Sequence, residues 1–308
     1  MSAPVFQRVA VVGLGLLGGS VALAARRRGV ARVVVGVSRR RETAERARET
    51  GVVEAASHRA AEVLAGADLV VLATPLEATE TTLRGLAPHL PEGALVTDVG
   101  SVKGSLAERL PGRLSRGAVF VGAHPMAGSH HRGLEHARAD LFEGAVCVLT
   151  PTAATPPEAL AQVRAFWEGL GSHVVQRSPG QHDLEVAWMS HVPHGLAFAF
   201  AAALEAAPEG SGALAGAGFR DFTRIARADP ELWADILNAN RKQVTGPLRT
   251  VAESIESLVR LLEAGDAEAL ERALAAARER LARHAAGAPA DGDENPERTL
   301  HRSDEDHS

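Results

Sequence analysis

Residues 13–18 read Gly-Leu-Gly-Leu-Leu-Gly, a glycine-rich turn that could hold the phosphates of a dinucleotide. The turn directly follows an apolar run at residues 9–12 and begins an alanine-rich stretch, which is the strand–turn–helix context that such a site requires. Gly13 allows the tight turn, Gly15 lets the backbone approach a diphosphate, and Gly18 lets helix and strand pack closely. Amide groups at the helix N-terminus then attract the phosphates. The predicted contacts in this segment are Gly13, Gly15, Leu16, Leu17 and Gly18.

The end of the second predicted strand carries the residues that would meet the cofactor's ribose. An acidic side chain usually stands there in NAD⁺ sites, whereas this chain has Ser38 followed by Arg39 and Arg40. Guanidinium groups suit a 2′-phosphate and favour NADP⁺, while a serine can still bond a free ribose, so NAD⁺ stays open. Thr74 and Pro75, which follow the third predicted strand, complete the predicted cofactor contacts on that edge.

Two more polar segments, residues 97–103 and 122–129, are predicted loops that follow strands at the carboxyl edge of the sheet, where ligands bind in such folds. His124 has a near-neutral intrinsic pKa, so it could take a hydroxyl proton while hydride leaves the same carbon. Ser101 could bond the same hydroxyl or fix the imidazole. By composition alone, a loop histidine more often has a structural role than a catalytic one.

The elements that must position these residues change in type near residue 179. Short β-branched runs alternate with helical stretches before that point, which predicts βαβ units and a parallel sheet covered on both faces. The predicted strands are residues 9–12, 32–37, 68–73, 94–97, 119–121 and 146–149. After it, only helical spacing is found, with Asp229 and Pro230 typical of a helix start. We therefore predict an α/β Rossmann-type dinucleotide-binding domain at 1–179, an all-α domain at 180–286 and a disordered acidic tail at 287–308.

Composition excludes several classes of protein. The 308 residues suit two domains, and 45% hydrophobic residues suffice for a large core. A net charge of -5 provides no basic field for nucleic acid or an anionic membrane. The single Cys147 excludes a disulfide framework, and the pair His191 and His194 lacks further ligands, so no metal is predicted. No apolar run approaches the ~20 residues that a membrane span needs, and the N-terminus resembles no export signal, which predicts a cytoplasmic protein.

Five segments, in this order along the chain, resemble the prephenate and arogenate dehydrogenases, the enzymes of the last oxidative steps of tyrosine synthesis. They cover the chain from residue 8 to about residue 285, and the last four are far more specific than the first. The segments are Gly-Leu-Gly-Leu-Leu-Gly-Gly-Ser at 13–20, Asp-Val-Gly-Ser-Val-Lys at 98–103, His-Pro-Met-Ala-Gly-Ser at 124–129, Ser-His-Val-Pro-His at 190–194 and Asp-Phe-Thr-Arg-Ile-Ala at 221–226.

The resemblance implies a role for each matching position. It implies that His124 is the catalytic base and that Ser101 is its partner, which bonds the hydroxyl and helps to place the cofactor. It also implies that Arg224 anchors a substrate carboxylate. The implied fold of the second domain is the helical fold of phosphogluconate dehydrogenase, and the implied reaction is oxidative decarboxylation with hydride transfer to NAD(P)⁺. Further implied substrate contacts are His194, Ser129, Asp221, which would orient Arg224, and Trp233.

Several alternatives stay open at this point. Prephenate and arogenate differ by a keto against an amino group on the side chain, and no residue can be named that distinguishes them. A β-hydroxyacid dehydrogenase or imine reductase could share the architecture, and so could an NADP-binding sensor without catalysis. The apolar segment 181–206 favours burial against a second copy, so we predict a homodimer formed through the helical domain.

Overall fold

The computed structural model describes residues 5–128 and 131–285, and it divides into two compact units, residues 1–249 and 250–308. The first unit combines the predicted dinucleotide-binding part with most of the helical part. Packing therefore groups the chain differently from secondary structure, and the predicted boundary at 179 stays a prediction. The predicted acidic tail at 287–308 lies outside the described residues.

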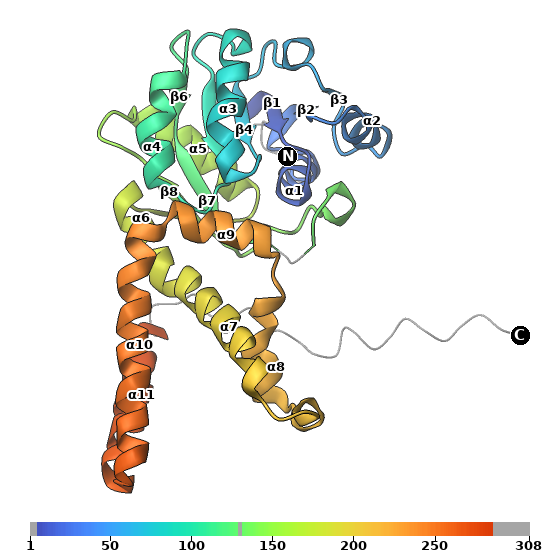
Figure 1. Cartoon of the computed structure of the whole chain (residues 1–308). Coiled ribbons are helices and arrows are strands. Elements are labelled where there is room, and N and C mark those ends of the chain that lie inside the picture. The colour runs from blue at the N-terminus through green and yellow to red at the C-terminus, as the bar shows by residue number, and fades with distance from the viewer. Residues whose placement is uncertain (1–4, 129–130, 286–308) are drawn as a thin grey trace, which may run out of the picture. The chain divides into compact units, whose positions relative to one another are not determined.

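A six-stranded parallel sheet forms the centre of the first unit (Figure 1). Its strand order, β3-β2-β1-β4-β5-β6, is that of a Rossmann fold, with a switch point between β1 and β4. The short β3 escaped the sequence prediction because its residues, Ala-Ala-Ser, are weak strand formers. The strands are β1 (Phe6–Val12), β2 (Ala31–Val37), β3 (Ala55–Ser57), β4 (Leu69–Leu72), β5 (Leu95–Asp98) and β6 (Val119–Phe120).

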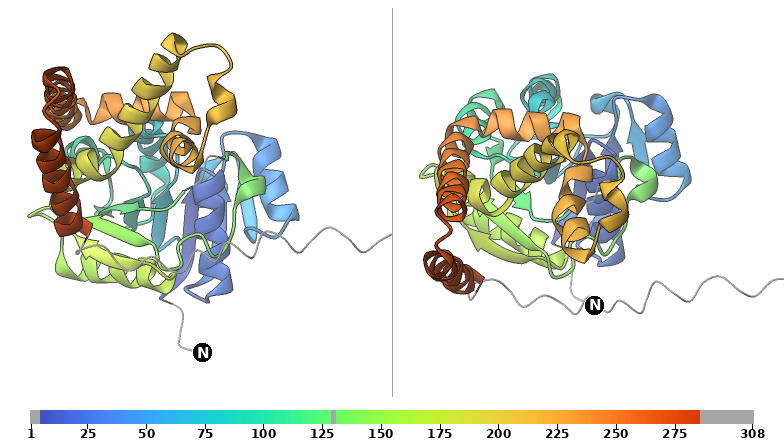
Figure 2. Two further views of the ribbon diagram at one scale, coloured as in Figure 1. Left: turned by 90° about the horizontal axis from the view of Figure 1, so that it is seen from below. Right: turned by 60° about the horizontal axis from the view of Figure 1, so that its bottom comes forward.

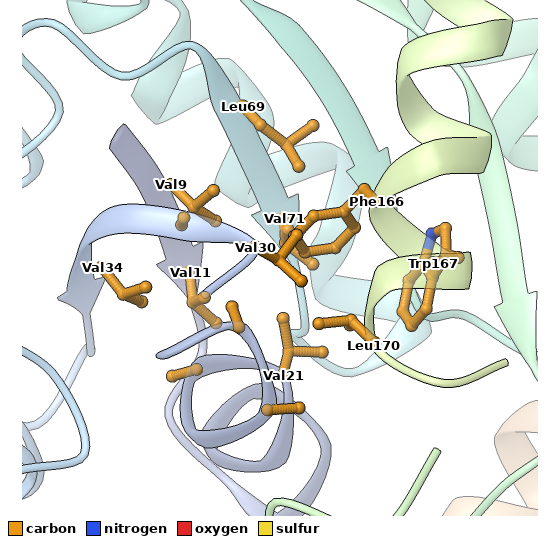
Figure 3. Close-up of a cluster of buried hydrophobic side chains, with 14 of the residues drawn as sticks. Val9, Val11, Val21, Val30, Val34, Leu69, Val71, Phe166, Trp167 and Leu170 are labelled. Atoms are coloured by element: carbon orange, nitrogen blue, oxygen red, sulfur yellow. The ribbon is translucent and has the colours of Figure 1, made fainter. Parts of the chain in front are cut away.

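Helices cover both faces of this sheet, as the continuous apolar strands require. Val9 and Val11 of β1 face the side of α1 and α5, where they pack with Phe166 in the larger buried cluster (Figure 3). Ala10 and Val12 face the opposite side, where α3 and α4 complete a second cluster. Figure 2 shows α1 and α5 on a common side of the sheet. The helices are α1 (Leu16–Arg27), α2 (Arg41–Glu49), α3 (Leu76–Leu86), α4 (Gly104–Arg109) and α5 (Pro157–Gly169).

A second, three-stranded sheet corrects the prediction at three places. Residues 122–125, predicted as a loop, form β7 (Gly122–Pro125), which pairs antiparallel with β8 (Val146–Thr150). The sixth predicted strand is this β8, so it belongs to the second sheet and not to the parallel one. The unpredicted β9 (His173–Gln176) pairs parallel with β8. An apolar run has the same composition in either sheet, so composition cannot indicate which partner it finds.

Only helices follow in the described residues after β9, as the spacing predicts. Ser178 caps the first of them, and Asp229 caps α9 by accepting from two backbone amides. A π-helical turn at Ala187–His191 separates α6 from α7. The helices are α6 (Pro179–Val186), α7 (Val192–Ala203), α8 (Ala217–Arg224), α9 (Pro230–Ala239), α10 (Arg241–Ala264) and α11 (Ala267–Ala285). Short 3₁₀ turns lie at Ala60–Glu62, Ala87–His89, Pro111–Arg113, Leu134–His136, Leu204–Ala206, Ser211–Leu214 and Ile225–Arg227.

The second unit consists, within its described residues, of the end of α10 and all of α11. Both segments expose apolar side chains, including Leu262 and Leu281. Across the described residues, no helix has the length and apolar character to pass through a bilayer.

Candidate active site

The glycine turn after β1 has the shape that a diphosphate needs. Gly13 has a φ of +99°, and a Cβ there would lie 2.4 Å from the carbonyl oxygen of Ala73. A Cβ on Gly18 would lie 1.8 Å from the carbonyl oxygen of Gly13, so only glycine lets α1 approach β1 this closely. A Cβ on Gly15, by contrast, would have no neighbour within 4 Å. The start of α1 is therefore open on the side where amide groups can meet phosphate oxygens.

A cavity of about 260 Å³ lies beside the start of α1. The rings of His131 and His136 stack in its wall with their centroids 4.4 Å apart, and Arg138 adds a guanidinium. Its lining residues are Leu16, Gly128, His131, His136, Arg138 and Leu141. Apolar surface combined with imidazole and guanidinium groups fits an anionic dinucleotide at this place.

The other predicted cofactor residues lie at the same carboxyl edge. Ser38 is buried at the end of β2, where its amide donates to Ser57, and Arg39 and Arg40 are exposed beside it. Thr74 and Pro75 connect β4 to α3, and the hydroxyl of Thr79 donates to the carbonyl oxygen of Pro75 at 3.0 Å. Leu16 and Leu17 begin α1. Because β1 and β4 are neighbours at the switch point, the predicted contacts follow adjacent strands at one edge of the sheet.

His124 stands on β7 and is the first member of a buried polar chain. Its Nδ1 lies 2.8 Å from Nε2 of His182, and Nδ1 of His182 lies 2.8 Å from Oδ1 of Asp183. The Asp183 carboxylate also accepts from the backbone amides of Lys103 and Gly104, each at 2.8 Å. A strand of the second sheet, helix α6 and the loop before α4 therefore meet at one point, with α6 beside α4 (Figure 1).

A second buried group fixes the segment that contains Ser101. The ammonium of Lys103 contacts Asp98 and donates to the carbonyl oxygen of Ala123 at 2.8 Å. Asp98 in turn accepts from the amides of Ala123 and Gly100, at 3.0 and 2.9 Å. Ser101, half-buried between Gly100 and Lys103, is thus on a loop tied to the strand of His124. The structure brings the two predicted catalytic residues to one edge by way of this buried ion pair.

Burial controls the protonation of the histidines in this region. It lowers the pKa of His124 well below the usual histidine value, and His182, Lys103 and His191 lower it further. Burial also lowers the pKa of His191 to about 4. His124 is therefore neutral at physiological pH, which is the form that can accept a proton.

The predicted substrate residues of the helical part lie around one indole. The imidazole of His194 stacks on Trp233 with ring centroids 3.6 Å apart and donates from Nδ1 to the carbonyl oxygen of Ser190 at 2.9 Å. Burial lowers the pKa of His194, and the nearby guanidinium of Arg224 contributes to that shift. Trp233 packs on Val102, next to the Ser101 segment.

Two predicted substrate residues stay apart from this group. Asp221 is exposed on α8, and within the part of the chain that is described no ion pair joins it to Arg224, so its orienting role stays a prediction. Ser129 lies outside the described residues.

Sequence reasoning assigned no role to His182, Asp183 or Asn240. The amide nitrogen of Asn240 donates to the carbonyl oxygen of Asp183 at 2.8 Å and lies 3.0 Å from Nδ1 of His191. The adjacent His-Asp pair at 182–183 near the start of an amphipathic helix was the only signal, and it resembles any polar helix face. His182 is separated from His124 by 58 residues, so only folding reveals the contact.

The fold and the site together define the class of the protein: a dinucleotide-dependent dehydrogenase, with a Rossmann sheet, an open glycine turn and a buried neutral histidine at the carboxyl edge. Comparisons with known proteins agree with this class. Residues 21–176 match the family model for the nucleotide-binding domain of prephenate dehydrogenase, and residues 178–276 match the model for its dimerization domain. The chain therefore belongs to the prephenate dehydrogenase family and is an oxidoreductase with a nicotinamide cofactor.

Individual relatives cover most of both chains. The chain is 35% identical to a prephenate dehydrogenase of Bacillus subtilis, over 86% of this chain and 72% of the relative. The crystal structure of Synechocystis arogenate dehydrogenase is 35% identical, with a TM-score of 0.79 over 90% of this chain and all of that one. The structure of prephenate dehydrogenase from A. aeolicus in complex with hydroxyphenyl propionate and NAD⁺ is 33% identical, with a TM-score of 0.83 over 90% and 98% of the two chains.

Proposed function

We propose that this protein oxidises prephenate to 4-hydroxyphenylpyruvate with loss of carbon dioxide, and that arogenate, giving tyrosine, is the alternative substrate. The observation that carries the proposal is the buried neutral His124 on β7, at the edge where the glycine turn opens. The names of the relatives support both substrates, because one similar structure is an arogenate dehydrogenase and another holds hydroxyphenyl propionate and NAD⁺.

The nicotinamide, when bound, accepts the hydride from the ring carbon that bears the hydroxyl group. In the proposed mechanism His124 accepts the proton of that hydroxyl, and Ser101 bonds its oxygen. The electrons of the bond to the leaving carboxylate then enter the ring, which becomes aromatic as carbon dioxide departs. The substrate is a dianion, so Arg224 would hold a carboxylate through a bidentate contact of the guanidinium. His194 donates from Nδ1 to Ser190 and would meet the substrate with Nε2, which accepts a hydrogen bond. Trp233 keeps His194 in place by stacking.

We propose NADP⁺ as the preferred cofactor. The support is the absence of an acidic side chain at the end of β2 and the exposed guanidinium groups of Arg39 and Arg40 beside the buried Ser38. These groups suit a 2′-phosphate. The similar A. aeolicus structure contains NAD⁺, so both cofactors are compared in the experiment.

We propose a homodimer formed by the helical part. The family model that matches residues 178–276 is named for dimerization. α6, the π-turn, α7 and α8 expose large apolar side chains in a single copy, which is typical of a surface that another copy covers. These side chains are Leu184, Trp188, Met189, Phe200, Leu204, Phe219 and Phe222. The cytoplasmic location predicted from the N-terminus stays a prediction.

One experiment tests substrate, cofactor and base together. Purified protein is mixed with prephenate or arogenate, each with NAD⁺ or NADP⁺, and formation of reduced nicotinamide is followed. We expect turnover with prephenate and NADP⁺, and a fall of kcat by about 10²- to 10⁴-fold in His124→Asn. Cofactor affinity, measured by fluorescence titration, should stay within about twofold in that variant.

Other outcomes decide against the proposal. Turnover with arogenate and not with prephenate would show that arogenate is the substrate, while the proposed oxidative decarboxylation would still hold. Absence of turnover in all four mixtures, with NADP⁺ still bound and His124→Asn without effect on binding, would instead favour a sensor without catalysis.

A further inference from the structure

We propose that His182 and Asp183 are positioning residues that hold His124 in one tautomer, with the proton on Nδ1 and a free lone pair on Nε2. The proposal deepens the function proposed above, because a base needs that free nitrogen to accept the substrate's proton. The tautomer itself is a property of the protein without substrate, so it can be tested separately from turnover.

The Asp183 carboxylate is the fixed end of this chain of hydrogen bonds. An ionised carboxylate only accepts hydrogen bonds. One oxygen accepts from the Lys103 amide, and the other accepts from the Gly104 amide, so two backbone donors hold the group in place and favour its charge. The oxygen facing Lys103 also meets Nδ1 of His182 at 2.8 Å, so that nitrogen must carry a proton.

The proton on Nδ1 of His182 then determines the donor and acceptor nitrogens of both imidazole rings. A neutral imidazole has one N–H donor and one acceptor nitrogen, so His182 in its neutral form presents Nε2 as an acceptor. Nδ1 of His124 lies 2.8 Å from it and must donate, which leaves Nε2 of His124 without a proton. A carboxylate held by backbone amides thereby specifies the reactive nitrogen of a histidine on another element. The arrangement follows the principle by which the aspartate of a serine protease fixes its histidine, with one more ring in the chain.

Burial protects this order of donors from water. The exposed fractions are 1% for His182, 6% for Asp183 and 7% for His124. The two rings meet edge to face with centroids 5.1 Å apart, a packing that also limits their rotation. An alternative tautomer would place two N–H groups or two lone pairs face to face without solvent to satisfy them.

Neighbouring charges are compatible with this role. Lys103 and His191 act on His124 in addition to His182, and both lower its pKa. Lys103 is paired with Asp98, and His191 has a pKa of about 4, so His191 is neutral at physiological pH. When His124 gains a proton, Asp183 is the carboxylate that faces the new charge through the ring of His182. Through His182, Asp183 therefore fixes the tautomer before the reaction, and its negative charge favours the charged form of His124 during it.

Asp183→Asn is the sharpest variant because it keeps the size of the side chain. Either orientation of the amide puts an NH₂ group opposite a donor: the Gly104 amide in one case, the Lys103 amide and His182 in the other. In the second orientation His182 must reverse its tautomer, and His124 then carries its proton on Nε2. His182→Gln serves as the conservative variant, because its side-chain oxygen can still accept from Nδ1 of His124.

The direct measurement is the ¹⁵N NMR spectrum of the histidine side chains in the full chain without substrate. The His124 signal is assigned by its loss in His124→Asn. We expect a protonated Nδ1 and an unprotonated Nε2 for His124 in the wild type and in His182→Gln. In Asp183→Asn we expect a mixture of both tautomers, because the two orientations of the amide favour different ones. A protonated Nε2 on His124 in the wild type overturns the proposal, whatever the enzyme turns over.

Kinetics supply the second measurement. In Asp183→Asn we expect kcat to fall by about tenfold or more, while KM and cofactor affinity change by less than about threefold. The acid limb of the pH–kcat profile should move to lower pH, because the negative charge that favours protonated His124 is lost. His182→Gly should lose activity similarly and regain part of it with added imidazole, whereas His182→Gln should lose less than about tenfold.

Thr150→Val is the matched control for packing. Its hydroxyl is buried without a partner among the described residues, and it lies on β8 opposite Gly122 of the His124 strand. The control should leave the NMR signals and kcat unchanged. An equal loss of kcat in Thr150→Val and Asp183→Asn would overturn the proposal, and so would a failure of imidazole to rescue His182→Gly. Either result would mean that His182 and Asp183 have only a structural role. The expected tautomer without turnover of either substrate would instead reject only the proposed function.

Discussion

At the scale of single residues, the site depends on charges and lone pairs that are kept away from water. His124, His182 and His191 are all buried, and each has a defined polar partner: another imidazole, the carboxylate of Asp183 or the amide of Asn240. Burial costs a charged imidazole more than a neutral one, and it lowers the pKa of His124 and of His191, so these two histidines are neutral at physiological pH. The cost of that arrangement is a fold that is sensitive to acid.

We expect the protein to lose stability as pH falls from 7 to 5. The pKa of His191 is about 4 in the folded chain, against about 6.5 when unfolded, so the unfolded chain binds more protons in this range. Stability is therefore complete above pH 6.5 and is lost as pH falls toward 4. His191 alone should lower the free energy of unfolding by about 2 kcal/mol between pH 7 and pH 5.

Urea unfolding at the two pH values measures this effect. His191→Gln, which can still accept from Asn240, is the comparison. Its free energy of unfolding should change less with pH than that of the wild type, by about the same 2 kcal/mol. Equal pH dependence in the two proteins would show that His191 is readily protonated in the fold.

At the scale of elements, the glycine turn serves two functions at different positions: close packing of α1 on β1, and access of a ligand to the start of α1. Gly18 has no room for a side chain because α1 lies against β1, whereas Gly15 faces open space at the start of that helix. Gly18 is thus required by folding, whereas we expect Gly15 to be required by the ligand. The same division recurs at the loop before α4, where Lys103 fastens the loop internally and Ser101 is left half-buried at the edge.

The pair Gly15→Ala and Gly18→Ala separates these functions by experiment. Gly15→Ala should unfold within about 0.5 kcal/mol of the wild type, because its φ of -95° suits any residue and its Cβ meets nothing. Its affinity for NADP⁺ should nevertheless fall at least tenfold, since the Cβ projects where the diphosphate would lie. Gly18→Ala should lose more than about 2 kcal/mol of stability because its Cβ meets backbone.

Calorimetric melting measures the stability of both variants, and cofactor titration measures their affinity for NADP⁺. Unchanged cofactor affinity in Gly15→Ala would move the diphosphate away from the start of α1. A fully stable Gly18→Ala would mean that α1 can shift from β1 more easily than the contact suggests.

At the scale of the whole molecule, the helical part presents an apolar surface that a single copy leaves exposed. Phe222 of α8 is 45% exposed and its ring lies 5.3 Å from that of Phe200 on α7, so the two form part of a continuous apolar face. The proposed second copy would cover this face and would also support the helices that carry His194 and Arg224.

Phe222→Glu should therefore convert the dimer to a monomer. Light scattering at micromolar concentration should give twice 32.2 kDa for the wild type and about 32.2 kDa for the variant, because a charge in an apolar interface is costly to bury. Val5→Glu is the control, since Val5 is similarly exposed at the start of β1. A monomeric wild type would reject the dimer, and an unchanged mass in Phe222→Glu would move the interface elsewhere.

The sequence by itself determined what depends on local order. Apolar runs and helical spacing predicted five of the six strands of the main sheet and the all-helical character of the second half, and the glycines indicated the dinucleotide turn. It also provided His124, Ser101, His194 and Arg224 as candidates through their motifs, and their roles stay proposals. Each of these signals lies within a few residues of chain.

Tertiary structure alone decided the partners of those residues. Whether β7 and β8 join the parallel sheet depends on pairing, and an apolar strand carries no information about its neighbour. The contacts from His124 to His182 and from Lys103 to Asp183 join residues 58 and 80 positions apart. Such hydrogen bonds exist only because folding removes water from both groups at once, so the tautomer of His124 is a property of the packed molecule and not of any segment.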